Sequence, residues 1–134
     1  MSEKTGGTKS VTAIIIDDDE LMRRVVVAAL TALNCDIVGE ADDGKQGLEL
    51  YRATRPDLVL LDIRMPEMDG IEALKNLQEI DANAYVVMMT FVDDEESVED
   101  TMIGGAKDYL RKNMPMKEMV ARLERHVARL SQVG

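Results

Sequence analysis

The stretch Leu58–Gly70, LVLLDIRMPEMDG, decides the fold class of this 134-residue chain. It places four aliphatic residues, Leu58–Leu61, directly before Asp62, and a loop closed by Asp69–Gly70 follows. A run this short and this apolar is typical of a strand buried on both faces, as in a parallel sheet. A carboxylate at the end of such a strand is costly without a partner, so the rest of the chain must pair with it or use it.

Similar short apolar runs alternate with longer amphipathic segments from residue 11 onward. The runs expected to form strands are 11–16, 36–41, 58–61, 85–89 and 106–110. The segments expected to form helices are 21–33, 44–54, 71–77, 93–102 and 116–130. Such an alternation predicts a parallel α/β sheet in a single domain.

Two of the expected helices carry marked ends. Asp93 and Glu96 have the spacing of a capping box at the start of the fourth helix, which Gly104–Gly105 then ends. The fifth helix is expected to begin at Pro115, where proline costs no hydrogen bond. Six of its residues recur at spacings of three and four and are expected to be buried: Met116, Met119, Val120, Leu123, Val127 and Leu130.

The composition indicates one compact acidic domain. Hydrophobic residues make up 46% of the chain, enough for a single core. With 26 acidic residues against 16 basic ones, the formal net charge is −10, which disfavours direct binding to nucleic acid or to an anionic membrane. Cys35 is the single cysteine, which excludes an internal disulfide and fits a reducing cytoplasm.

Residues 1–10 are polar, with no apolar core for a signal peptide. No run of about 18 apolar residues, the length that spans a membrane, occurs in the sequence. We therefore expect a flexible tail over 1–10, one domain over 11–131 and a short C-terminal end over 132–134. We also expect a cytoplasmic location and no membrane partner.

Polar side chains follow four of the expected strands, at the ends where parallel sheets bind ligands. These residues are Asp17, Asp18, Asp19, Asp62, Thr90 and Lys112. Carboxylates that converge repel one another unless a cation intervenes, and oxygen ligands favour a hard ion such as Mg²⁺. Because Mg²⁺ keeps sites for phosphate oxygens, Asp62 is predicted to attack phosphorus, while Thr90 and Lys112 stabilise the developing charge.

Four segments, IIIDDDELMRR, PDLVLLDIRMPEMDG, VVMMTF and GGAKDYLRK, resemble the receiver domain of two-component response regulators. The resemblance extends from residue 11 to about residue 130 and is greatest to the stand-alone, CheY-like kind. It implies a flavodoxin-like, doubly wound five-stranded parallel sheet with strand order 2-1-3-4-5 and five helices. Chemotaxis is one pathway that it suggests.

The resemblance also implies a chemical role for each site residue. Asp62 would accept a phosphoryl group from the phosphohistidine of a histidine kinase or phosphotransfer protein. Asp18, Asp62 and the backbone carbonyl of Arg64 would ligate Mg²⁺, and Asp17 would hold metal-bound waters. The protein would then catalyse only its own phosphorylation and dephosphorylation and would not be an enzyme acting on an external substrate.

A two-state switch is the expected consequence of phosphorylation. By resemblance, Thr90 would move to bond a phosphoryl oxygen, and Tyr109 would rotate inward. These movements would change the face formed by the fourth helix, the fifth strand and the fifth helix, to which a downstream protein effector binds.

Some of these residues also have plain structural interpretations. Asp19 is expected to cap the first helix. Taken alone, Tyr109 reads as a half-buried core aromatic and Lys112 as a surface lysine. His126 is the only histidine, lies on the expected last helix without metal-binding companions, and is interpreted as a surface residue.

The sequence departs from the family pattern at several positions. Asn113 follows Lys112 where the family usually has proline in a cis peptide, so the aim of the lysine is open. Phe91 stands where a small residue is usual, and we expect its ring to slow attack by water and small phosphodonors. Arg64 and Val92 occupy positions that tune the hydrolysis rate within the family.

Three alternatives remain open at this point. The chain could be the receiver half of a longer transcription factor. It could be a pseudo-receiver that binds partners without phosphorylation, if Asn113 or Phe91 disables the site. A haloacid-dehalogenase-like phosphatase also uses a strand-end aspartate, but expects Asp-x-Asp-x-Thr, whereas Ile63–Pro66 follows Asp62.

Overall fold

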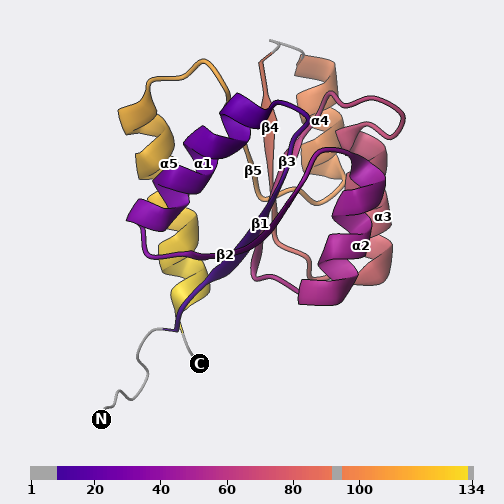
Figure 1. Ribbon diagram of the computed structural model, residues 1–134. Coiled ribbons are helices and arrows are strands. Elements are labelled where there is room, and N and C mark those ends of the chain that lie inside the picture. Colours follow the sequence, from indigo (N-terminus) through magenta and orange to yellow (C-terminus); the bar gives the residue numbers. More distant parts are fainter. Residues whose placement is uncertain (1–8, 92–94, 133–134) are drawn as a thin grey trace.

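A computed structural model describes residues 9–91 and 95–132, which form a parallel sheet with helices on both faces (Figure 1). The first half of the chain contains β1 (Thr12–Ile16), α1 (Glu20–Ala32), β2 (Asp36–Ala41), α2 (Gly44–Thr54) and β3 (Leu58–Asp62). The second half contains α3 (Gly70–Ile80), β4 (Val86–Thr90), α4 (Glu95–Ile103), β5 (Asp108–Arg111) and α5 (Met116–Ser131). The strand order β2-β1-β3-β4-β5 confirms the predicted topology.

The sheet separates two hydrophobic cores. Successive side chains of a strand point to opposite faces, so each central strand contributes to both cores. Ile14 and Leu61 pack on the side of α2, α3 and α4, whereas Ile15 and Leu60 pack on the side of α1 and α5. Burial on both faces explains why the third strand has an uninterrupted apolar sequence.

Aspartate side chains cap the N-termini of α1, α2 and α3. The Asp19 carboxylate accepts hydrogen bonds from the amides of Leu21 and Met22, which confirms the predicted cap of α1. Asp43 and Asp69 cap α2 and α3 in the same way. These caps fix the chain direction immediately after the strand ends, where the polar residues of the site lie.

Several element ends differ from the sequence expectations. The fourth strand is shifted by one residue, to Val86–Thr90, and the fifth begins later, at Asp108. The predicted burial of Met116 is wrong, because the residue is 47% exposed. A helical side chain lies over the turn that precedes it, and Met116, as the first residue of α5, has no such turn. The proposed cap residue Asp93 lies outside the described residues.

The N-terminal segment meets the end of α5. The Lys9 amide donates to the carbonyl of Ser131 over 2.8 Å, and the Lys9 ammonium lies 2.7 Å from Asp57. The contacts of the domain therefore include Lys9, within the segment expected to be a tail. Among the described residues, no helix has the length and hydropathy required to cross a membrane.

Candidate functional site

Three carboxylates meet at the carboxyl ends of β1 and β3. Ile16 pairs with Leu61 in the parallel ladder, so Asp17 and Asp62, which follow them, emerge side by side. Asp17 and Asp62 are buried, whereas Asp18 is exposed. Ligand oxygens of Asp17, Asp18 and Asp62 all lie within 4.8 Å of one another, as the strand-end positions predicted.

Lys112 supplies the positive charge of the cluster. Its ammonium lies 2.7 Å from Oδ2 of Asp17 and 3.3 Å from Oδ1 of Asp62, and its side chain is only 3% exposed. The interpretation of Lys112 as a solvated surface lysine is therefore wrong. All peptide bonds of the described residues are trans, including the one between Lys112 and Asn113, and the lysine reaches both carboxylates in this geometry.

Thr90 completes the crevice from β4. Asp62 pairs with Met89 across β3 and β4, so Thr90 lies one residue beyond this pair, at the same edge of the sheet. The threonine is 1% exposed, and its carbonyl accepts a hydrogen bond of 2.7 Å from the Lys112 amide. This bond joins the end of β4 to the residue that carries the ammonium.

The loop after Asp62 folds back tightly onto the strand. The Arg64 amide lies 3.3 Å from Oδ1 of Asp62, and the Gly70 amide donates to the Ile63 carbonyl over 2.7 Å. A Cβ atom at Gly70 would lie 2.2 Å from the backbone oxygen of Asp62, a distance that no side chain tolerates. The Asp69–Gly70 pair therefore combines a helix cap with the close approach that the loop requires.

The local electrostatics favour a bound cation. Burial and the neighbouring Asp17 charge raise the pKa of Asp62 to about 7, although Lys112 acts in the opposite direction. Oδ2 of Asp17 accepts no hydrogen bond of good geometry and has the Lys112 ammonium as its close neighbour. A donor set of carboxylate oxygens fits a hard divalent cation such as Mg²⁺, whose charge would keep Asp62 ionised at neutral pH.

The structure also places Phe91 and Tyr109, two further residues singled out in the sequence. Phe91 is 56% exposed, and its ring centroid lies 5.2 Å from the Lys112 ammonium. Tyr109, in β5, is half-buried and packs against the core on the α4 side of the sheet. Val92 lies outside the described residues.

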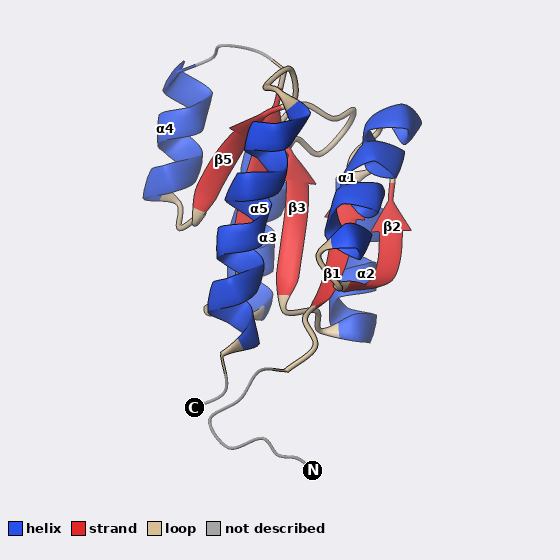
Figure 2. Ribbon diagram, turned by 90° about the vertical axis from the view of Figure 1, so that its left-hand side faces the viewer, coloured by secondary structure: helices blue, strands red, loops and turns tan. Residues whose placement is uncertain are grey.

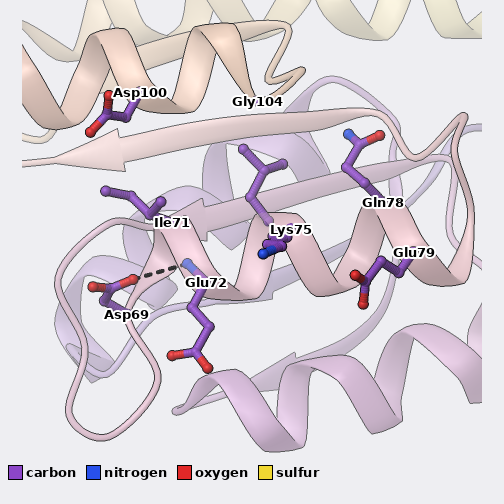
Figure 3. Close-up of a pocket in the computed structure, with 9 residues that line it drawn as sticks. Asp69, Ile71, Glu72, Lys75, Gln78, Glu79, Asp100 and Gly104 are labelled. Atoms are coloured by element: carbon purple, nitrogen blue, oxygen red, sulfur yellow. Dashed lines mark hydrogen bonds between the residues drawn. The ribbon is translucent and has the colours of Figure 1, made fainter.

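A separate groove of about 690 Å³ lies between α3 and α4 (Figure 3). Lys75 and Gln78 of α3 and Asp100 of α4 are among the residues that line it, and Asp17, Asp62 and Lys112 are not. The sequence gives no signal for this groove, because it depends on how the neighbouring helices α3 and α4 pack together in space.

His126 is also placed differently from expectation. Its side chain is 12% exposed, so the interpretation as a surface residue is wrong. Nε2 lies 2.8 Å from a carboxylate oxygen of Asp108, and Nδ1 lies 2.7 Å from the hydroxyl of Tyr85. These partners are far from His126 in the sequence, and helical periodicity gave no indication of them.

Comparisons with known sequences agree with this geometry. Residues 13–124 match the sequence model of the response regulator receiver domain. The chemotaxis protein CheY of Bacillus subtilis is 41% identical over 99 residues, which cover 74% of this chain and 82% of that protein.

Comparisons with solved structures agree as well. CheY in a CheX-CheY-BeF3-Mg²⁺ complex from Borrelia burgdorferi superposes with a TM-score of 0.81 and 31% identity, covering 87% of this chain and 88% of that one. The signal receiver domain of NarL from Mycobacterium tuberculosis gives a TM-score of 0.81 and 33% identity, covering 90% and 98% of the two chains.

Proposed function

This chain belongs to the response regulator receiver domain family, and from that membership we propose that it is a phosphorylation-dependent signalling switch of the CheY-like kind. Asp62 accepts a phosphoryl group from the phosphohistidine of a histidine kinase or a phosphotransfer protein. The observation that carries this proposal is the buried Asp62 carboxylate at the end of β3, 3.3 Å from the buried Lys112 ammonium.

The transfer is a displacement at phosphorus. An Asp62 oxygen attacks, the new O–P bond forms as the N–P bond to imidazole breaks, and the departing nitrogen takes up a proton. The Lys112 ammonium and the Thr90 hydroxyl stabilise charge on the phosphoryl oxygens. The product is an acyl phosphate on Asp62, which water later hydrolyses.

The acidic cluster would hold Mg²⁺ during this reaction. Asp18, Asp62 and the backbone carbonyl of Arg64 are the proposed ligands, with Asp17 acting through metal-bound water. The ion, when bound, supplies positive charge between the carboxylates and the phosphoryl oxygens. Support for the proposal comes from the 4.8 Å clustering of the three carboxylates and from the related CheY, which was solved with BeF3 and Mg²⁺.

Output passes through the face formed by α4, β5 and α5, and Figure 2 shows β5 between these two helices. A phosphoryl group on Asp62 draws the Thr90 hydroxyl toward it, and Tyr109 moves into the space that Thr90 leaves. A protein effector in the cytoplasm then binds the altered face, and chemotaxis is the candidate pathway. The complex of the related CheY with CheX is an example of a protein partner in this family.

Rival functions have less support. A haloacid-dehalogenase-like phosphatase expects a second aspartate and a threonine after the nucleophile, and the residues that follow Asp62 include neither at those positions. We therefore propose that the protein catalyses only its own phosphorylation and dephosphorylation. The pseudo-receiver alternative needs a disabled site. Lys112 contacts both Asp17 and Asp62 although Asn113 replaces the usual proline, which argues against a disabled site.

Intact-protein mass spectrometry after incubation with acetyl phosphate tests the proposal. Wild type is expected to gain one phosphoryl adduct that requires Mg²⁺, and Asp62→Asn is expected to gain none. Glu49→Gln, which changes an exposed carboxylate on α2, is the matched control and should behave as wild type. If acetyl phosphate gives no adduct and beryllofluoride with Mg²⁺ also fails to bind wild type, the switch proposal is wrong.

A further inference from the structure

A second charged cluster lies on the α5 side of β5, and the proposed phosphorylation chemistry does not use it. Asp108, the first residue of β5, is its centre, with 18% of its side chain exposed. The Arg122 guanidinium contacts both of its oxygens, with Nε 3.1 Å from Oδ2. His126 Nε2 lies 2.8 Å from the same Oδ2.

This cluster holds the backbone of Tyr109 on both sides. The Tyr109 amide donates to Oδ1 of Asp108 over 2.8 Å, and the Tyr109 carbonyl accepts from Nη2 of Arg122 over 3.1 Å. Because successive side chains alternate along a strand, Asp108 faces α5 while the Tyr109 ring faces the core under α4. The cluster therefore connects α5 to the residue that would report phosphorylation to α4.

His126 can change charge without losing its hydrogen bonds. Nε2 faces a carboxylate and carries a proton in either state, whereas Nδ1 accepts from the Tyr85 hydroxyl when the ring is neutral and donates to it when the ring is charged. Histidine is the side chain that changes charge between about pH 5 and 8. Proton uptake thus converts the contact with Asp108 into an ion pair, which is a stronger hydrogen bond.

Other charged groups near His126 set the background for this titration. Arg122 of α5 shares the Asp108 carboxylate, Arg129 of α5 interacts with Tyr85, and the Lys107 ammonium lies 5.8 Å from the centroid of the Tyr85 ring. Although burial acts to raise it, the hydrogen bonds from His126 and Arg122 hold the pKa of Asp108 well below its usual range. Asp108 therefore stays ionised over the pH range in which histidine side chains change charge.

We propose that His126 is a proton-dependent positioning residue for the Tyr109 switch and acts through Asp108. Proton uptake strengthens the contact between His126 of α5 and Asp108 of β5, beside Tyr109. Phosphorylation at Asp62 in turn changes the proton affinity of His126, because coupling between two sites is reciprocal. This inference rests on the proposed function, in which Tyr109 responds to the phosphoryl group.

Nuclear magnetic resonance on the full chain tests the coupling directly. The single histidine gives one set of imidazole signals, and ¹⁵N-tyrosine labelling gives one amide signal for each of three tyrosines, assigned with Tyr→Phe variants. Beryllofluoride with Mg²⁺ serves as the probe of the phosphorylated state. We expect it to change the proton affinity of His126 at least about twofold, a shift of about 0.3 pH unit in the midpoint. The chemical shift of the Tyr109 amide should change with pH at the same midpoint as the imidazole signal of His126.

Two variants separate positioning from a merely structural role. His126→Gln should remove the pH dependence of the Tyr109 amide chemical shift. The circular dichroism spectrum of this variant should be the same as that of wild type. Asp108→Asn, which keeps the shape but removes the charge, should weaken the pH dependence of the Tyr109 amide signal, because His126 acts through this carboxylate.

The ¹⁹F signal of bound beryllofluoride distinguishes the two ways to fail. If that signal appears and requires Asp62, but the His126 midpoint is the same with and without the probe, the coupling is wrong and the proposed function stands. If no bound signal appears in wild type, the proposed function fails and the coupling to it falls as well.

Discussion

The Lys112 ammonium reaches across the end of β4 to lie 3.3 Å from Oδ1 of Asp62, and these side chains are only 3% and 4% exposed. Taking both charges out of water is expensive, so the pair is weak evidence for stability. Its location beside the proposed phosphoacceptor gives it a chemical use instead, because an ammonium in a dry crevice stabilises a phosphoryl group strongly.

Replacing Lys112 by methionine should therefore slow phosphorylation of Asp62. We expect Lys112→Met to gain the acetyl phosphate adduct at least about tenfold more slowly, a loss of about 1.4 kcal/mol of transition-state stabilisation. The measurement is the adduct fraction against time by intact mass. Lys75→Met, which changes an exposed lysine of α3, is the control and should react as wild type does. Equal rates in all three proteins would show that Lys112 has no part in the transfer.

The pKa of Asp62 leads to a prediction about stability and pH. Burial and Asp17 raise this pKa from its ordinary 3.8 to about 7, so the folded protein binds this proton more tightly than the unfolded chain. The stability that this raised pKa contributes is fully present below pH 3.8 and is lost as the pH rises toward about 7. In EDTA, we therefore expect the Asp62 contribution to the free energy of unfolding to fall between about pH 4 and about pH 7.

Urea denaturation at several pH values measures this effect. Asp62→Asn should remove the Asp62 part of the slope, and added Mg²⁺ should raise the stability of wild type at the alkaline end. Other ionisable groups also respond to pH, so the informative quantity is the difference between wild type and Asp62→Asn. A difference that does not vary with pH would contradict the raised pKa.

The sequence predicted the sheet order and the converging residues because both depend on local signals. The apolar run before Asp62 and the polar residues at the other strand ends are read directly, and a parallel sheet brings such ends together. The interpretation of His126 as a surface residue is wrong because its partners, Asp108 and Tyr85, lie 18 and 41 residues away in the sequence. A helix period shows which residues share a face, but it does not show which polar group that face meets.

Phe91 is expected to restrict access to Asp62, the proposed phosphorylation site. Its ring centroid lies 5.2 Å from the Lys112 ammonium and the residue is more than half exposed, so Phe91 lies at the opening of the crevice. Phe91→Ala should gain the adduct from acetyl phosphate faster and lose the acyl phosphate faster, each severalfold. Quenched samples analysed by intact mass give both rates. Ile103→Ala, which truncates an exposed apolar residue of α4, should change neither. An acyl phosphate lifetime equal to that of wild type would remove Phe91 from this role.

Gly70 tests how the fold and the site depend on the same backbone contact. A Cβ atom at this position would lie 2.2 Å from the Asp62 carbonyl oxygen, so Gly70→Ala must displace either α3 or the end of β3. We expect a loss of about 1–3 kcal/mol in the free energy of unfolding, typical of overpacking. Urea denaturation measures this loss against Gly104→Ala, where the nearest atom lies 3.2 Å away and the cost should be smaller. Because the displaced backbone carries Asp62, the Gly70→Ala variant should also be phosphorylated more slowly than wild type by acetyl phosphate in the presence of Mg²⁺. Full stability together with a wild-type rate would mean that the loop adjusts without moving Asp62.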